Sequence, residues 1–379
     1  MTPPLAGLRI IEMAGIGPAP FCGMMLADHG AEVIRIERPG ERGGFSAAAK
    51  DPLLRSRRVM QLDMKRPEAV LAVRRLAQSC DGLIEGFRPG VMERLGLGPD
   101  ALLADNPKLV YGRMTGWGQT GPMAQDPGHD INYIALSGAL HALGTTGGKP
   151  VAPINLIGDF GGGGMMLAFG MLAAILQAQA TGRGQVVDCA MTEGSSVLMS
   201  MIWGFRAMGR WNDARGTNLI DGGAHFYDTY ETADGKWVSI GAIEPQFYAA
   251  LRTAMGLEGH EWDAQFAASA WPGLKAELAR RFRERTRDDW VAAFAGHEAC
   301  FAPVLDFDEA VAHPHNRDRA AFVEAGGVVQ PAPAPRYSMS STVTPVMADA
   351  IETEAILAEH GFSEDEIAAL RAAGAMGAA

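Results

Sequence analysis

The 379-residue sequence is poor in cysteine and has no excess of basic residues. Its four cysteines lie far apart and form no Cys-x-x-Cys pair, so the sequence predicts neither a disulfide framework nor a zinc site. The formal net charge of −11 argues against a general nucleic-acid role, because phosphate binding depends on clustered lysine and arginine. We therefore expect a metabolic protein of a reducing compartment, the cytoplasm.

Long apolar runs are also missing. The first residues do not combine a basic segment with an apolar one, and no uninterrupted apolar stretch reaches the length of a membrane span. The sequence thus predicts neither secretion nor a membrane partner. The apolar helix expected over residues 165–180 is interpreted as a buried core helix.

Short apolar segments alternate with amphipathic ones through the first part of the chain. The pattern predicts strands at residues 8–13, 31–37, 82–85 and 109–115, and helices at 20–29 and 66–79. This alternation indicates an α/β fold with a mainly parallel sheet. Near residue 226 two strand-like arms flank an Asp234-Gly235 turn, which predicts a hairpin at the start of a second domain.

A histidine and an aspartate stand in two glycine-rich passages. His129 lies in GHDINY at 128–133, and Asp159 lies in NLIGDFGGGG at 155–164. An imidazole and a carboxylate on opposite sides of one carbon can exchange its proton. The alternatives are a structural loop histidine and an N-cap aspartate. Four successive glycines favour a backbone that approaches a ligand, with N–H groups that face developing negative charge.

The loop GIGPAP at 15–20, with Glu37 at the end of the next strand, imitates a dinucleotide-binding fingerprint. Pro20 stands where the third glycine would permit close helix–strand packing, so a nicotinamide dehydrogenase is disfavoured. A tight turn and a ligand-lining loop both remain open interpretations of this segment.

Six basic residues gather within one stretch of this acidic chain. They are Arg35, Arg38, Arg55, Arg57, Arg58 and Lys65. Such a cluster suits a phosphate-bearing ligand, whereas a solvated surface is the alternative for any single arginine. No metal site is predicted: His313 and His315 flank a proline without further ligand-type neighbours, and they are interpreted as a turn.

Four further motifs carry a resemblance to a known family. They are PLAGLR at 4–9, IEGFRPGV at 84–91, TGWGQTGP at 115–122 and GRGQVVD at 182–188. With these motifs the chain resembles the family III CoA-transferase and racemase superfamily over nearly its whole length. GHDINY resembles the racemase branch, because transferases of the superfamily match around Asp159 without requiring His129.

The resemblance implies an isomerase that inverts the α-carbon of a 2-methylacyl-CoA thioester through an enolate. It implies His129 and Asp159 as the two acid/base groups, and Glu244 as an assistant to Asp159 from the second domain. It implies no metal or redox cofactor, since CoA is part of the substrate. Two alternatives stay open: CoA transfer with Asp159 as the nucleophile, and a silent CoA-binding module.

The resemblance also implies ligand contacts and an assembly. Arg38, Arg55, Arg57 and Arg58 are expected to hold CoA phosphates, and Arg94 to lie near the thioester. Ile16, Tyr133, Gly158 and Gly161 complete the expected lining. The implied assembly is an interlocked homodimer. Its Rossmann-like large domain comprises residues 1–200 and 326–379, with a linker at 201–225 and a small α+β domain at 226–325.

Overall fold

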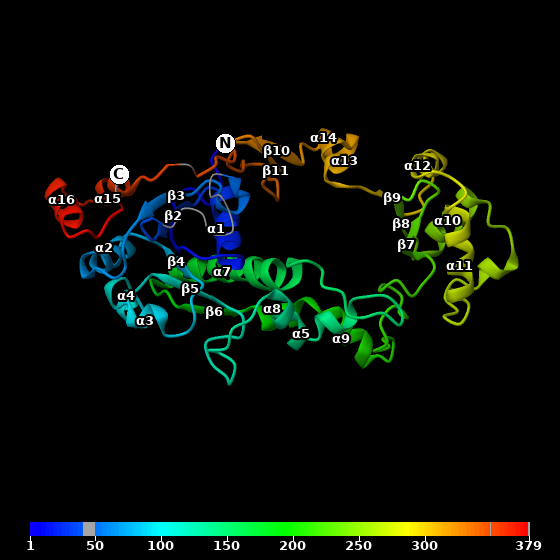
Figure 1. Cartoon of the computed structure of the whole chain (residues 1–379), viewed down its shortest axis with the longest axis horizontal. Coiled ribbons are helices and arrows are strands. Elements are labelled where there is room, and N and C mark those ends of the chain that lie inside the picture. The colour runs from blue at the N-terminus through cyan, green and yellow to red at the C-terminus, as the bar shows by residue number, and fades with distance from the viewer. Residues whose placement is uncertain (41–49, 349, 378–379) are drawn as a thin grey trace. The chain divides into compact units, whose positions relative to one another are not determined.

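The computed structural model describes residues 1–40, 50–348 and 350–377 of the chain (Figure 1). The chain forms two compact units. The first unit is Met1–Ser137, Ile154–Leu198 and Ala320–Ala379, and the second is Gly138–Pro153 and Met199–Arg319. The predicted division left residues 138–153 in the large domain and 201–225 in a linker, whereas both segments lie in the second unit here.

The first unit is built on a six-stranded sheet in which each strand is parallel to its neighbours. The strands are β1 (Arg9–Met13), β2 (Glu32–Glu37), β3 (Arg58–Gln61), β4 (Gly82–Glu85), β5 (Val110–Thr115) and β6 (Val186–Ala190). Their order is β3-β2-β1-β4-β5-β6, the order of doubly wound dinucleotide-binding folds, which reverses between β1 and β4. The prediction of an α/β fold with a parallel sheet is confirmed.

Helices cover both faces of this sheet, because successive side chains of a strand point to opposite faces. Ile10 packs in an apolar cluster with α1 (Pro18–Asp28) and α7 (Met166–Thr181), whereas Ile11 packs in a cluster with α2 (Pro67–Ala77). Among the described residues, the other helices of this unit before its C-terminal segment are η2 (Pro52–Leu54), α3 (Val91–Arg94), α4 (Pro99–Asp105), α5 (Asp130–Leu136), η3 (Leu156–Met165) and α8 (Met191–Leu198).

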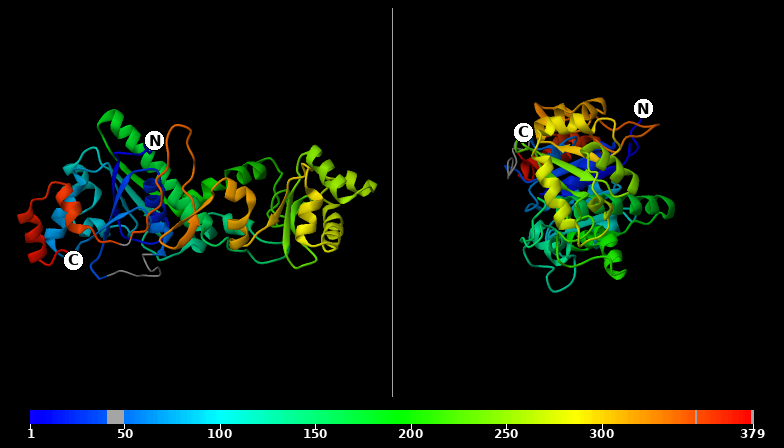
Figure 2. Two further views of the ribbon diagram at one scale, coloured as in Figure 1. Left: turned by 90° about the horizontal axis from the view of Figure 1, so that it is seen from above. Right: turned by 90° about the vertical axis from the view of Figure 1, so that its right-hand side faces the viewer.

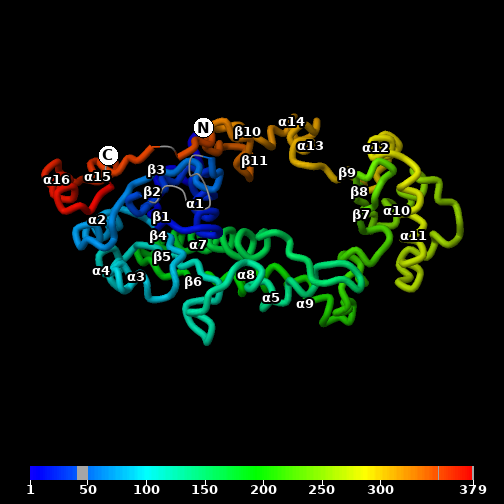
Figure 3. Tube along the Cα trace, in the orientation of Figure 1, coloured from blue at the N-terminus to red at the C-terminus, as the bar shows by residue number. Residues whose placement is uncertain are grey.

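The C-terminal segment returns to the sheet of the first unit (Figure 3). Isolated bridges join Ile351 to Val59 and Met376 to Leu62. Ser363 caps the last helix and forms the capping box that the sequence predicts. The elements of this segment are β10 (Phe322–Ala325), β11 (Val328–Pro331), α15 (Thr353–Glu359) and α16 (Glu364–Ala372).

The apolar helix predicted over residues 165–180 is α7, which Figure 2 shows in two further views. Only one of its faces is buried. Leu167 and Met171 are fully buried in the cluster with Ile10. Phe169 and Leu176 are 71% and 69% exposed. Together with η3, the stretch Leu156–Thr181 is long and apolar enough to cross a membrane by length and composition. The prediction of a core helix therefore holds for one face only.

The second unit contains a three-stranded antiparallel sheet, β7 (Tyr227–Glu231), β8 (Trp237–Gly241) and β9 (Phe301–Val304). The predicted hairpin is confirmed: Glu231 pairs with Trp237 across the Asp234-Gly235 turn. His313 lies between α13 and α14, as the predicted turn requires. The helices of this unit are α6 (Ala139–Ala142), α9 (Ser200–Ala207), α10 (Pro245–Met255), η4 (His260–Asp263), α11 (Trp271–Phe282), α12 (Arg287–Phe294), α13 (Phe307–Ala312) and α14 (Pro314–Asp318).

Candidate active site

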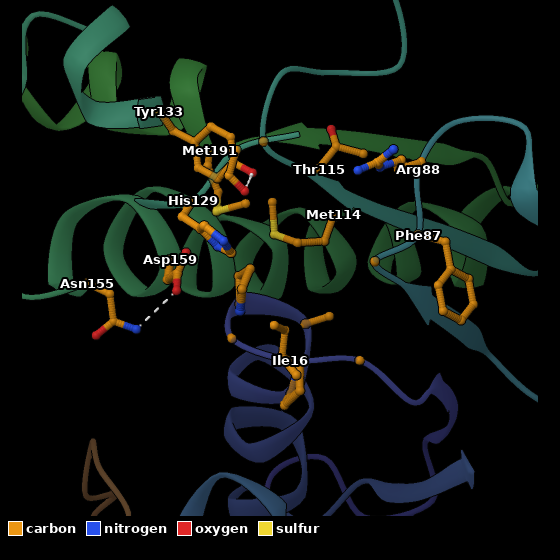
Figure 4. A pocket seen from close by; sticks show the side chains of 18 of the residues that line it. Ile16, Phe87, Arg88, Met114, Thr115, His129, Tyr133, Asn155, Asp159 and Met191 are labelled. Carbon is orange, nitrogen blue, oxygen red and sulfur yellow. Dashed lines mark hydrogen bonds between the residues drawn. The ribbon is translucent and has the colours of Figure 1, made fainter. Parts of the chain in front are cut away.

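A cavity of about 900 Å³ lies in the first unit, where the strand order of the sheet reverses. The segments that follow β1, β4 and β5 form part of its wall, namely residues 15–20, 86–89 and 116–117. In open parallel sheets a ligand binds beyond the carboxyl ends of the strands at this reversal. The starts of α5 and η3 supply the other side of the wall (Figure 4). The topology of the sheet thus determines where this pocket forms.

His129 and Asp159 both line this cavity (Figure 4). His129 is the exposed N-cap residue of α5, and its backbone N–H donates to Asn132 Oδ1 at 3.1 Å. Asp159 is half-buried in the first turn of η3, a π-helix, which is a conformation frequent at functional sites. The structure therefore brings the two acid/base candidates into one pocket from the starts of two helices.

The surroundings of Asp159 favour its protonated form. Burial is the largest influence, and it raises the pKa of the Asp159 carboxyl above its ordinary value. The Asn155 amide donates a hydrogen bond to Asp159 Oδ2 at 3.0 Å and opposes this rise. The charge of Asp130 raises the pKa further, and His129 lowers it. A carboxyl whose pKa lies closer to neutral pH is better suited to both giving and taking a proton.

The backbone N–H of Asp159 is already engaged. It donates to Asp130 Oδ1 at 2.8 Å, so it does not face a ligand oxygen in this structure. That N–H groups of the glycine run near Asp159 face developing negative charge stays a prediction. Neither Gly158 nor Gly161 belongs to the cavity wall as the described residues form it. A Cβ at Gly158 would lie 2.4 Å from Asp130 Oδ1, and a Cβ at Gly161 would lie 3.1 Å from the Leu156 carbonyl oxygen, so both glycines serve close packing.

The loop after β1 lies against Asp159. Gly17 has a φ of 68°, and a Cβ added there would lie 3.1 Å from Asp159 Oδ2. Ile16 is 74% exposed and lines the cavity, as predicted. Of the two interpretations left open for residues 15–20, the structure favours the ligand-lining loop.

Tyr133 also lines the cavity and orders the loop before His129. Its hydroxyl donates a hydrogen bond to the Gly128 carbonyl, and its ring packs edge-on against Trp117 with centroids 4.7 Å apart. A Cβ at Gly116 would lie 2.0 Å from this ring, so only glycine leaves room for it. Burial raises the pKa of the Tyr133 phenol, which keeps it a neutral hydrogen-bond donor.

Two of the arginines predicted to hold phosphates are buried in ion pairs. Arg55 is 3% exposed and its Nε donates to Asp28 Oδ1 at 2.9 Å. Arg57 is 5% exposed and its Nε donates to Glu12 Oε2 at 3.0 Å. Glu12 is fully buried and also pairs with Arg35. These contacts give Arg55 and Arg57 a structural role, and they leave the charges of both side chains balanced.

The other predicted cations lie outside the described cavity wall. Arg58 forms ion pairs with Glu32, Glu352 and Glu359. Arg38, after β2, and Arg94, at the end of α3, are exposed. None of the five arginines at 38, 55, 57, 58 and 94 contributes to the cavity wall as described. Their contact with CoA stays a prediction.

Arg88 is a pocket residue that the sequence reasoning did not select. Its side chain is exposed and lines the cavity (Figure 4). Arg35 also lines the cavity, but it is held by Glu12 and Glu37. Among the described residues no carboxylate forms an ion pair with Arg88. The motif IEGFRPGV at 84–91 contains Arg88, and its place directly after a strand was the available signal.

Glu244 belongs to the second unit, where it is the N-cap residue of α10. Its negative charge acts on Cys300, whose pKa is raised by burial first and by Glu244 second. Cys300 is exposed, unlike Cys22, Cys80 and Cys189. The assistance of Glu244 to Asp159 stays a prediction.

Comparison with known proteins assigns the family. Residues 5–350 match CoA-transferase family III, and the chain belongs to this family. Among its relatives, the α-methylacyl-CoA racemase of Mus musculus is 46% identical and that of Homo sapiens 44% identical, each over 367 residues that cover 96% of this chain and 95% of the relative. The crystal structure of a CAIB/BAIF family protein from Brucella suis shares the fold, with a TM-score of 0.82 at 24% identity over 95% of this chain and 100% of that chain.

Proposed function

We propose that this chain is a racemase of 2-methylacyl-CoA thioesters. The observation that carries the proposal is the pair His129 and Asp159 in the wall of one cavity. The chain that forms this cavity is 46% identical to the α-methylacyl-CoA racemase of Mus musculus and 44% identical to that of Homo sapiens. An imidazole and a carboxyl with a raised pKa are suited to proton transfer at a carbon beside a thioester.

The reaction exchanges one proton at the α-carbon. The thioester carbonyl acidifies the α-proton, and the Asp159 carboxylate takes it to leave a planar enolate. The protonated imidazole of His129 then gives a proton to the opposite face, and in the reverse direction the two groups exchange roles. Each positioned group contributes roughly 10²- to 10⁴-fold to the rate. The chemistry needs no metal or redox cofactor, since CoA is part of the substrate.

The cavity wall offers groups for both ends of the substrate. Arg88 lines the cavity and forms no ion pair with a carboxylate among the described residues. We therefore assign it to an anionic group of CoA. The apolar side chains of Ile16, Met114 and Met191 suit the acyl part. The predicted phosphate contacts of Arg38, Arg55, Arg57 and Arg58, and the place of Arg94 near the thioester, remain part of the proposal.

A second copy of the chain is the proposed partner. The outer face of α7 exposes Phe169 and Leu176, by 71% and 69%, and Met165, the last residue of η3, is 45% exposed. An apolar face of this kind marks an interaction surface. We propose that a homodimer covers this face and that Glu244 then assists Asp159.

The proposal is tested by incubating one enantiomer of a 2-methylacyl-CoA with the protein in deuterated water. We expect deuterium at the α-carbon together with loss of optical purity. CoA transfer, the alternative in which Asp159 attacks the thioester, gives a different result. It moves CoA to an added carboxylic acid and leaves the α-carbon undeuterated, and that outcome would overturn the racemase proposal.

A further inference from the structure

One buried carboxylate connects the two acid/base candidates. Asp130 follows His129 directly in the chain, is the first residue of α5 and is 6% exposed. Its Oδ1 accepts the backbone N–H of Asp159 at 2.8 Å. A single side chain is thus attached to one candidate through the backbone and to the other through a hydrogen bond.

The hydrogen bond from the Asp159 N–H to Asp130 supplies an acceptor that η3 itself lacks. The first N–H groups of any helix have no acceptor within that helix, and the hydrogen bonds of a π-helix reach back five residues. Asp159 is the fourth residue of η3, so its N–H requires an external acceptor. Asp130 supplies this acceptor from the first turn of α5.

The neighbourhood of Asp130 leaves little freedom for this contact. A Cβ at Gly158 would lie 2.4 Å from Asp130 Oδ1 and 3.2 Å from Ile134 Cγ2, so a side chain at residue 158 would displace the carboxylate. Asp130 Oδ2 is buried, and within the described part of the chain it has no hydrogen-bond partner. A buried carboxylate oxygen without a partner is costly, which indicates a role other than stability.

We propose that Asp130 is a positioning residue for the reaction, holding the backbone of Asp159 in fixed geometry relative to His129. This inference rests on the racemase function proposed above. It assigns to Asp130 no contact with substrate. A displacement of about 1 Å between reacting groups can cost about 10²-fold in rate, so the hydrogen bond has a measurable consequence.

The charge of Asp130 has a second effect. It raises the pKa of the Asp159 carboxyl, in the same direction as burial. The other groups that act on Asp159 are Asn155, which donates to it, and His129 at the start of α5. The charge of Asp159 in turn raises the pKa of the Tyr133 phenol. An Asp130→Asn variant keeps an acceptor oxygen and removes the charge, whereas Asp130→Ala removes both. The two variants therefore separate geometry from charge.

The experiment compares Asp130→Asn, Asp130→Ala and a control, Asp100→Asn, which removes an exposed carboxylate from the first turn of α4. For Asp130→Ala we expect a loss of about 10²-fold in kcat, with KM within about twofold of the parent value. Asp130→Asn should recover part of kcat. Its pH–rate profile should move to lower pH on the limb that belongs to Asp159. The control should match the parent protein in both respects.

Nuclear magnetic resonance gives a reading that does not depend on turnover. In Asp130→Ala the amide proton of Asp159 should lose the shift caused by its hydrogen bond, and in Asp130→Asn the Asp159 carboxyl carbon should titrate at lower pH. A folded Asp130→Ala variant with the parent kcat, or with unchanged Asp159 signals, overturns the inference. If the parent protein itself exchanges no α-proton, the proposed function fails, and the Asp159 signals still decide whether Asp130 positions it.

Discussion

Gly17 lies so close to Asp159 that a Cβ at residue 17 would stand 3.1 Å from Asp159 Oδ2. Gly17→Ala would crowd the carboxylate and place alanine at a φ of 68°, which strains any L-residue. We expect a fall in kcat of about tenfold to a hundredfold, because a displaced acid/base group works in poor geometry.

Gly7→Ala is the matched control for Gly17→Ala. Gly7 has a φ of 91°, and nothing lies within 4 Å of an added Cβ, so this change introduces strain without crowding. Thermal unfolding and kcat should be measured for both variants. Equal losses of kcat would refute the contact between Gly17 and Asp159 as the cause.

The same substitution at two arginines should give different results. Arg57→Met leaves the fully buried Glu12 with one cation fewer, and breaking a buried pair costs about 3 to 5 kcal/mol. Arg88→Met removes an exposed cation from the cavity wall. We expect a large fall in the free energy of unfolding for Arg57→Met. For Arg88→Met we expect an unchanged fold and a KM raised about tenfold or more, the scale of one charge-assisted hydrogen bond.

These two variants also test the phosphate prediction. Denaturant unfolding and steady-state kinetics should be measured on both proteins. Should Arg57→Met keep the parent stability and raise KM alone, the buried ion pair would be the wrong interpretation of Arg57, and the predicted phosphate contact would be supported.

The second unit should lose stability in mild acid because of His225. This residue is fully buried, with Nε2 2.8 Å from the Tyr248 hydroxyl, and burial lowers the pKa of its imidazole to about 4. An unfolded histidine titrates near the ordinary value of 6.5. The contribution of neutral, buried His225 to the free energy of unfolding is therefore complete above pH 6.5. It falls as the pH approaches 4, by about 3 kcal/mol in total.

This dependence is measured as the free energy of unfolding of the second unit against pH. His225→Gln should flatten the curve between pH 6.5 and 4, and His297→Gln, which changes an exposed histidine of the same unit, should not. An imidazole signal of His225 that titrates near pH 6.5 in the folded protein would contradict the account.

The proposed assistance of Glu244 in a homodimer makes a prediction about mixed dimers. If each site combines His129 of one chain with Glu244 of the other, co-expressed His129→Ala and Glu244→Ala chains form heterodimers with one intact site. Activity should return in the mixture although each variant alone is inactive. Heterodimers confirmed by mass spectrometry but without activity would argue that both residues serve the site from the same chain.

Local sequence patterns were sufficient to predict several strands of the first unit. The strand Gly82–Glu85 has the predicted bounds, and β1 and β2 differ from the prediction only at their first residues. These segments are short apolar runs that end at glycine or charge, which is the strongest local signal for a buried parallel strand. The capping box at Ser363 is equally local.

Long-range pairing was not visible in the sequence. Arg58 begins β3, and its charge looked like part of a ligand site because its partner Glu359 lies 301 positions away. Arg55 and Asp28 are 27 positions apart and meet only through the fold. At the candidate site, the residue types and the glycines indicated His129 and Asp159. The hydrogen bond between Asp130 and Asp159 depends on how α5 meets η3, which no local pattern encodes.

The central claim is that His129 and Asp159 serve opposite faces of one carbon, and α-proton exchange by single variants tests it most directly. Each enantiomer of a 2-methylacyl-CoA should be incubated in deuterated water with His129→Ala and with Asp159→Ala. We predict that neither variant racemises and that each exchanges the α-proton of one enantiomer with retention, a different enantiomer for each variant. A folded variant that still racemises, or two variants that exchange the same enantiomer, would contradict the account.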